Sequence, residues 1–205
     1  MNHQPKKTYL AAMNFLAHML LSCEEEELMV GNFLGDFIKN RELPGFTPGI
    51  QQGIRLHRHI DTFTDAHPMV RQGTKRLHPR HGKYAGVVVD VLYDYILANN
   101  WTDLGPGRLQ DFADRTYETL MSHLPQMPER LHTIVPRMIG DNWLVRYGTK
   151  DGIAFTFSRI QRRVSKPEAL ENVLISLEEN EKELTNEFRQ FFPEIAAAVK
   201  AFCAC

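Results

Sequence analysis

The chain has 205 residues, of which 43% are hydrophobic and 24% are charged, and its formal net charge is −1. This composition is that of an ordinary globular protein, and it excludes whole-chain disorder and a strongly basic nucleic-acid binder. No apolar run approaches the ~20 residues of a membrane-spanning helix, so no membrane partner is expected. One folded domain is expected over residues 13–200, after an N-terminal extension over residues 1–12 for which disorder is one interpretation.

Helical patterns begin with an apolar segment over residues 14–22. Ser22 is expected to cap the next helix, because residues 24–27 are all glutamates and acids in a first turn complement the helix dipole. This second helix is predicted to continue to about Lys39.

A proline- and glycine-rich loop over residues 44–49 separates these helices from a long helical pattern over residues 50–65. Pro68 either interrupts that pattern or begins another helix, since proline is excluded from helix interiors but suits a first turn. Residues 78–82 are predicted to form a turn.

The segment 83–101 contains three consecutive valines that suit a strand, but its apolar residues recur at helical spacing over too long a stretch for one strand. A helix is therefore predicted there. Further helices are expected over about residues 108–124, 129–147 and 151–163, the last of these capped by Asp151, and a final helix is expected to start after Pro167 and to break or restart at Pro193. The fold class is all-α, a single-domain bundle of about seven or eight helices.

The three cysteines are Cys23, Cys203 and Cys205, and they form no CxxC pair. This number and spacing do not suggest a disulfide framework, and they suit the reducing cytoplasm. The Cys-Ala-Cys terminus is interpreted as an incidental tail, with metal binding or oxidation as the alternatives.

Acidic and histidine side chains recur at four-residue spacing in two predicted helices. His57, Asp61 and Asp65 lie on one face of the first, and Asp90 and Asp94 repeat the spacing among apolar neighbours on the second. Unpaired carboxylates are costly to bury, and a divalent cation removes that cost. Arginine partners are the alternative to a metal for the second pair.

The earlier helices add two candidate ligands within apolar stretches. The predicted metal ligands are His18, Asp36, His57, Asp61, Asp90 and Asp94. Carboxylate-rich ligation favours magnesium or manganese, and imidazole also admits iron, nickel or zinc. A core histidine, a loop cap and a helix-surface pair are the structural alternatives for individual members. No glycine-rich phosphate loop and no serine nucleophile elbow is present, which disfavours nucleotide triphosphatases and serine hydrolases.

Six sequence blocks together resemble the acyl carrier protein phosphodiesterase family. They span residues 13–18 (MNFLAH), 31–37 (GNFLGDF), 53–68, 90–101, 142–147 (NWLVRY) and 191–193 (FFP). The resemblance implies metal-assisted hydrolysis, with manganese or magnesium, of the phosphodiester that joins 4'-phosphopantetheine to a serine of holo-acyl carrier protein. It also implies distant kinship with HD-type phosphohydrolases, although three residues separate His57 from Asp61 where those enzymes have an adjacent pair. Met13 is a candidate for the authentic first residue.

Charge suggests roles for the remaining polar residues. Asp61 or Asp94 is expected to orient the attacking water, and Arg58 or Arg71 to stabilise charge on the phosphoryl group. His67 is a candidate proton donor, with a turn role before Pro68 as the alternative. The predicted substrate-binding residues are Arg55, Arg71, Arg76 and Arg146.

Between residues 55 and 83, seven basic and two acidic residues give a charge of +5, which suits the steering of an acidic carrier protein; a solvated helix face is the alternative. Two other functions fit parts of the pattern. A metal phosphohydrolase of nucleotides or other small phosphoesters would keep the acid and histidine cluster, and a non-enzymatic helical binding protein would use that cluster structurally.

Overall fold

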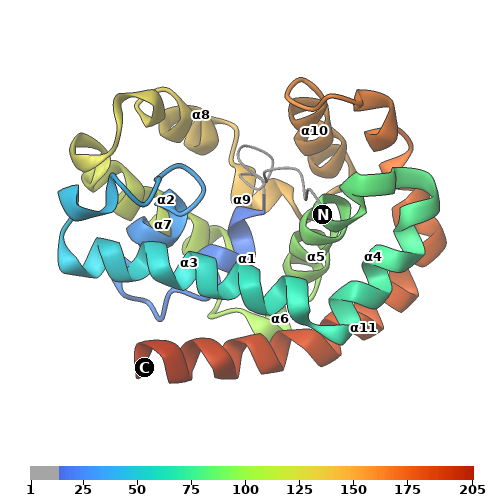
Figure 1. Ribbon diagram of the computed structural model, residues 1–205, viewed down its shortest axis with the longest axis horizontal. Coiled ribbons are helices and arrows are strands. Elements are labelled where there is room, and N and C mark those ends of the chain that lie inside the picture. Colours follow the sequence, from blue (N-terminus) through green and yellow to red (C-terminus); the bar gives the residue numbers. More distant parts are fainter. Residues whose placement is uncertain (1–13) are drawn as a thin grey trace.

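The computed structural model describes residues 14–205, and within that range the secondary structure is entirely helical (Figure 1). The expected all-α class is confirmed. The expected number of helices is too low, because eleven α-helices and five 3-10 helices are present in this range, three of the α-helices with six residues or fewer. These short helices are α1 (Phe15–Leu20), α6 (Trp101–Leu104) and α9 (Trp143–Arg146). The predicted extension over residues 1–12 lies outside the described residues.

The longer helices are α2 (Glu26–Leu34), α3 (Pro48–Ala66), α4 (Pro68–His81), α5 (Ala85–Asn99), α7 (Leu109–Ser122), α8 (Ile134–Gly140), α10 (Lys150–Gln161) and α11 (Val173–Cys203). The 3-10 helices lie at Leu43–Gly45, Gly82–Tyr84, Leu124–Gln126, Glu129–Leu131 and Pro167–Leu170. No helix within residues 14–205 is long and apolar enough to cross a membrane.

The junction of α3 and α4 shows how proline divides the long helical pattern. Thr47 caps α3 by accepting a hydrogen bond from Ile50 N, and Pro48 occupies the first turn. His67 has an extended backbone, as the residue before a proline prefers, and Pro68 begins α4. Of the two outcomes expected at Pro68, the structure has the start of a second helix.

Helix α5 lies at the centre of the molecule and contacts α1, α4, α10 and α11 (Figure 1). From residue 88 to 97 every side chain except Asp90 is buried. A helix that is apolar on all sides is a buried helix, which explains why the valine-rich segment also suited a strand. The helical prediction is confirmed.

Helices α2 and α3 cross in backbone contact. A Cβ atom on Gly31 would lie 2.1 Å from the carbonyl oxygen of Ile50, and one on Gly53 would lie 2.3 Å from that of Leu28. Only glycine allows this approach at both positions. The crossing brings the C-terminal end of α2 next to the middle of α3.

Three expected helix boundaries are wrong. Ser22 does not cap α2, because its hydroxyl donates to the carbonyl of His18, and Glu25 occupies the cap position. The helix ends at Leu34, not near Lys39. Thr149 caps α10 in place of Asp151, accepting from the amide of Gly152.

Two expectations for the second half also fail. The single helix predicted over 129–147 is divided at Asn142, which has a left-handed backbone (φ 47°) and a side chain bonded to Tyr117 and Gln110. Asparagine tolerates this conformation better than most residues. Helix α11 runs through Pro193 without ending there.

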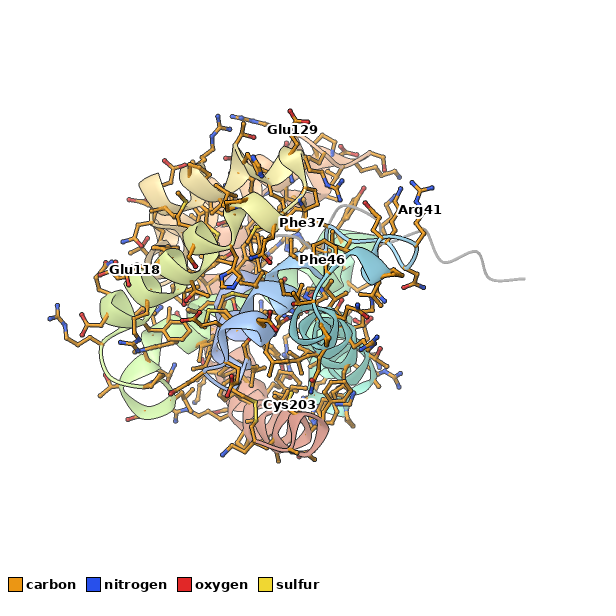
Figure 2. All side chains as sticks on the ribbon, turned by 90° about the vertical axis from the view of Figure 1, so that its left-hand side faces the viewer. Phe37, Arg41, Phe46, Glu118, Glu129 and Cys203 are labelled. Atoms are coloured by element: carbon orange, nitrogen blue, oxygen red, sulfur yellow. A yellow bond between two sulfur atoms is a disulfide. The ribbon has the colours of Figure 1, made fainter. Side chains whose placement is uncertain are left out.

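The C-terminal end of α11 lies far from the 3-10 turn at Glu129, on the opposite side of the molecule (Figure 2). Near that turn, Arg130 donates a hydrogen bond to the carbonyl of Phe37.

Beyond α11, a disulfide joins Cys205 to Cys23, and Cys203 remains a free thiol. The interpretation of the terminus as an incidental tail is therefore wrong, and cysteine usage no longer supports a reducing compartment.

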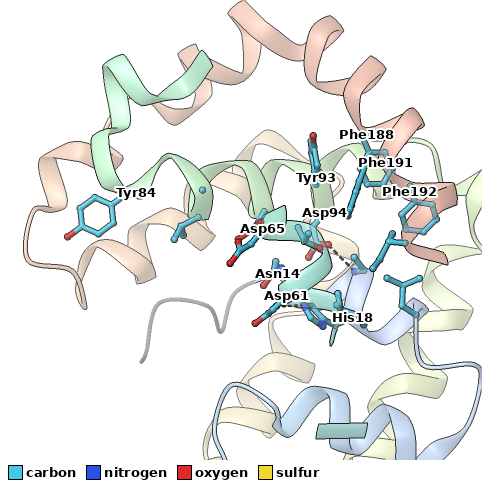
Figure 3. Close-up of a pocket in the computed structure, with 18 of the residues that line it drawn as sticks. Asn14, His18, Asp61, Asp65, Tyr84, Tyr93, Asp94, Phe188, Phe191 and Phe192 are labelled. Atoms are coloured by element: carbon cyan, nitrogen blue, oxygen red, sulfur yellow. Dashed lines mark hydrogen bonds and ion pairs between the residues drawn. The ribbon is translucent and has the colours of Figure 1, made fainter. Parts of the chain in front are cut away.

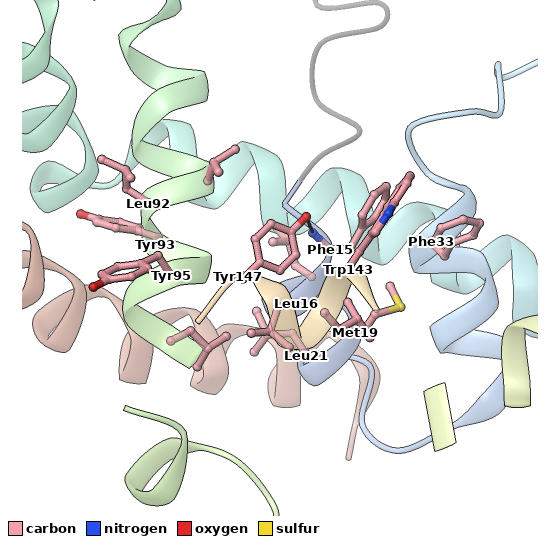
Figure 4. Close-up of a cluster of buried hydrophobic side chains, with 14 of the residues drawn as sticks. Phe15, Leu16, Met19, Leu21, Phe33, Leu92, Tyr93, Tyr95, Trp143 and Tyr147 are labelled. Atoms are coloured by element: carbon pink, nitrogen blue, oxygen red, sulfur yellow. Dashed lines mark hydrogen bonds between the residues drawn. The ribbon is translucent and has the colours of Figure 1, made fainter. Parts of the chain in front are cut away.

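Aromatic residues fix the short helix α1 in the core (Figure 4). The ring of Phe15 packs 5.4 Å from Phe33 and 6.2 Å from Trp143, measured between centroids. The amide of Phe15 donates to the hydroxyl of Tyr147 at 3.4 Å. A six-residue helix has little stability of its own, so these contacts determine where its one histidine lies.

Candidate functional site

Four of the six predicted metal ligands meet where α1, the end of α2 and α3 come together. His18 Nε2 lies 3.6 Å from Asp61 Oδ1, and His57 Nε2 lies 3.5 Å from Asp61 Oδ2 and 3.3 Å from Asp36 Oδ1. The two imidazole rings stack with centroids 4.3 Å apart. We call these four side chains the histidine–carboxylate cluster.

Asn32 orients both imidazoles. Nδ1 of His18 lies 2.8 Å from the side-chain oxygen of Asn32, and Nδ1 of His57 lies 2.8 Å from its backbone oxygen. Because both partners are acceptors, both Nδ1 atoms carry the proton and both Nε2 atoms face the carboxylates. The amide nitrogen of Asn32 donates to the His18 carbonyl and to Ser22 Oγ, which fixes its orientation.

Gly35 leaves the space that the ring of His57 occupies. A Cβ atom on Gly35 would lie 2.1 Å from Cγ of His57, so any larger residue would displace the imidazole. The glycine lies directly after α2, next to Asp36. The packing of α2 on α3 therefore fixes both the ring and its nearest carboxylate.

Burial shapes the electrostatics of the two histidines. Burial lowers the pKa of His18 to about 4, and the neighbouring His57 acts in the same direction. For His57, burial acts to lower the pKa, but Asp36 and Asp61 raise it above its ordinary value. His18 is therefore neutral at neutral pH, which is the form that binds a metal.

Nε2 of His57 is buried and makes no hydrogen bond within residues 14–205, although carboxylate oxygens lie 3.3 and 3.5 Å away. With the proton on Nδ1, a nitrogen lone pair faces two carboxylates, an arrangement that only a shared cation or an added proton stabilises. His18, His57 and Asp61 each offer a ligand atom within 4.8 Å of the others. The donor set fits a divalent metal ion.

Asp94 has different partners from the cluster. Its two carboxylate oxygens accept hydrogen bonds from the amides of Leu16 and Ala17, both at 2.9 Å, at the start of α1. The side chain is fully buried, and burial raises its pKa to about 7 against the opposing effect of the two amides. Asp94 thus anchors the helix that carries His18.

A cavity of about 410 Å³ opens beside the cluster (Figure 3). Its polar lining includes His18, Asp61, Asp65, Asp90 and Asp94, so both members of the second predicted acid pair face the same space as two of the cluster residues. Its apolar lining includes Leu21, Ile60, Phe188, Phe191, Phe192 and Ile195.

The arginines predicted to bind substrate do not line this cavity. Arg58 donates to Asn40 and to the carbonyl of Ile38. The remaining partners are Gln51 for Arg55, the carbonyl of Asp65 for Arg71, Glu187 for Arg76 and the ring of Phe155 for Arg146. The basic side chains in the lining are Lys83 and Arg163 instead. Apart from Gln51, which lies one turn before Arg55 on α3, these partners lie on other helices or loops, so spacing along the sequence did not indicate them.

His67 lies in the turn before Pro68, as the alternative to a proton-donor role predicts. Its Nδ1 accepts from the amide of Met69 at the start of α4, and its Nε2 lies 3.2 Å from Glu194. It does not line the cavity. The structure therefore gives no support to a proton-donor role.

Sequence reasoning missed Asn32 and Gly35. A polar residue in the middle of the apolar helix α2 was the available signal for Asn32, since buried amides require hydrogen-bond partners. For Gly35 the sequence offered no signal, because the atom that it avoids belongs to another helix.

The fold and the cluster define an all-helical protein with a candidate histidine–carboxylate metal centre at the edge of an apolar cavity. The family model for acyl carrier protein phosphodiesterases matches residues 13–195. Relatives of that name from Escherichia coli strains K12/DH10B, O9:H4 and O139:H28 are each 32% identical over 186 residues, which is 90% of this chain and 96% of theirs. No solved structure matches. The chain belongs to the acyl carrier protein phosphodiesterase family.

Proposed function

We propose that this chain is a metal-dependent phosphodiesterase that releases 4'-phosphopantetheine from holo-acyl carrier protein by hydrolysing its bond to the carrier serine. Membership of the family supports the reaction and the substrate. The observation that carries the metal dependence is the His18, His57 and Asp61 group, which brings two imidazoles and a carboxylate within 4.8 Å.

His18, His57 and Asp61 would hold the cation, with Asp36 beside them. A divalent cation supplies Lewis-acid polarisation of the phosphoryl oxygen and makes a nearby water more acidic. Manganese fits this donor set better than magnesium does, because magnesium prefers oxygen ligands and two of the donors are nitrogens.

The protein's own side chains perform three tasks in this proposal. Asn32 holds both imidazoles with Nε2 directed at Asp61. Asp61, with a side chain 37% exposed, faces the cavity and orients the attacking water there. Asp94 keeps α1, and with it His18, in position.

The cavity suits the arm of the substrate. Phosphopantetheine combines a charged end with a long and mostly uncharged chain, and the lining combines a polar cluster with an apolar wall. The carrier proteins are expected in the cytoplasm with the enzyme, and neither a membrane nor a nucleic acid is required.

The test is incubation of purified protein and manganese with holo-carrier protein, followed by mass spectrometry. We expect the carrier to lose the mass of phosphopantetheine, and we expect His57→Ala and Asp61→Asn to lower the rate by at least about 100-fold through loss of metal. His78→Ala, at an exposed histidine of α4, is the matched control. Hydrolysis of free nucleotides without action on the carrier would instead show that the protein is a nucleotide phosphohydrolase. Absence of any turnover would indicate a non-enzymatic binding protein.

A further inference from the structure

The C-terminal end of α10 and the segment after it carry concentrated positive charge. Residues 152–167 contain four basic and no acidic side chains. Lys83, from the 3-10 turn before α5, donates to Ser165 Oγ at 3.1 Å and thereby joins them. We call this set the α10 rim; its members are Lys83, Arg159, Arg162, Arg163 and Lys166.

In the part of the chain that the structure describes, no acidic partner neutralises the exposed part of this rim. Within residues 14–205, Arg162, Arg163 and Lys166 form no ion pair, and all three are exposed. The guanidinium of Arg159 lies 3.4 Å above the ring of Trp143. Burial lowers the pKa of Arg159 to about 10, and the positive charges of Arg163 and Arg137 act in the same direction.

In the basic stretch over residues 55–83, for which the sequence left steering and a solvated helix face open, two cations have acidic partners. Arg76 makes two hydrogen bonds to Glu187, and Arg80 makes two to Glu179. These cations stabilise the packing of α4 on α11. Lys83 is the only one of the seven basic residues in that stretch that lines the cavity.

The α10 rim is continuous with the cavity, because Lys83 and Arg163 line it together with His18 and Asp61. The residues that line the cavity also follow a definite order from one of its ends to the other. Figure 3 shows Tyr84, the neighbour of Lys83, at one end and Phe191 and Phe192 at the other, with Asp61 and His18 between them.

We infer that the α10 rim is the docking surface for the acidic carrier protein, and that the arm passes the histidine–carboxylate cluster with its far end toward the phenylalanine wall. The inference rests on the proposed function and adds the surface and the orientation of the substrate. The order of features along the cavity matches the order of groups in the substrate, which are the carrier, the phosphodiester and the arm. Opposite charges also accelerate association between the two proteins.

The test is the affinity of fluorescently labelled holo-carrier protein, measured by anisotropy with divalent metal withheld so that nothing is hydrolysed. We expect the Kd to rise at least about tenfold in Arg162→Glu/Lys166→Glu, and less in Arg162→Gln/Lys166→Gln, because rim charges contribute through long-range attraction. Neither residue lines the cavity. Lys182→Glu/Lys200→Glu, the same change of charge at exposed sites of α11, is the control and should keep the wild-type Kd.

A Kd within twofold of the wild type in the rim variant, or an equal loss in the α11 control, would overturn the docking surface. So would a single-stranded RNA oligonucleotide that binds the rim and displaces the carrier at a lower concentration than unlabelled carrier does. Failure of the wild type to release phosphopantetheine with manganese would reject the proposed function, while the comparison of Kd values would still decide where the carrier binds.

Discussion

Asn32 connects the two imidazoles of the candidate metal centre through its side-chain and backbone oxygens. Groups that orient metal ligands contribute strongly to affinity because they fix the tautomer and the ring plane. We expect Asn32→Ala to weaken manganese binding about 10–100-fold by isothermal titration calorimetry. Asn180→Ala, which removes a partly buried asparagine from α11, is the control. The variant removes only the contact to His18, because alanine keeps the backbone oxygen that holds His57. Wild-type affinity in Asn32→Ala would therefore show that packing alone holds the ring of His18.

The buried carboxyl of Asp94 predicts a dependence of stability on pH. Its pKa of about 7 in the folded protein lies above the ordinary value of 3.8, so between these pH values the folded state binds a proton that the unfolded state releases. The free energy of unfolding therefore falls as the pH rises from about 4 to about 7 and then levels off, by a few kcal/mol in all.

Urea unfolding of the metal-free protein at several pH values tests this, with Asp94→Asn as the comparison. The asparagine does not titrate, so the free energy of unfolding of the variant should lack this part of the slope. Relative to the wild type, the variant should therefore become more stable as the pH rises toward 7. The opposite slope would mean that the amides of Leu16 and Ala17 stabilise the carboxylate more than burial opposes it.

At the scale of helices, the position of His57 depends on the crossing of α2 and α3. A methyl group on Gly53 would meet the backbone of Leu28 at 2.3 Å and of Gly31 at 2.7 Å. We expect Gly53→Ala to lower the free energy of unfolding by at least about 2 kcal/mol, because backbone cannot yield as a side chain can. Gly140→Ala is the matched control; its added methyl meets nothing within 4 Å, and it should change stability by at most about 1 kcal/mol. Thermal and denaturant unfolding measure both variants.

The helices differ in whether neighbouring residues or contacts with other helices determine where they begin and end. The division of α3 from α4 follows from the sequence His67-Pro68, since proline restricts the residue before it. The break at Asn142 depends on hydrogen bonds to Tyr117 and Gln110 of α7. No periodicity within residues 129–147 reveals those partners, so the predicted helix was too long.

For the molecule as a whole, metal binding and stability are linked, because the ligands come from separate segments that only the folded chain brings together. Manganese at about 100 times its Kd should add about 2.7 kcal/mol to the stability, which corresponds to a rise in Tm of roughly 5–10 °C. Differential scanning fluorimetry with and without a chelator measures the shift. The shift should vanish in His57→Ala and persist in His78→Ala; an equal shift in both would place the metal elsewhere.

The sequence by itself determined the helical class, the division at Pro68 and the face of α3 that carries His57 and Asp61. These features depend on helical period and backbone restriction, which act over a few residues. The family blocks in the sequence were sufficient for the assignment that the comparisons support.

Only the tertiary structure decided which acids and histidines meet. His18 and Asp36 join His57 and Asp61 because Gly31 and Gly53 let α2 and α3 touch and because the aromatic core holds α1. The structure likewise turned Asp94 toward the amides of α1. The physical reason is that such contacts depend on distances between segments far apart in the chain, which spacing along one helix does not encode.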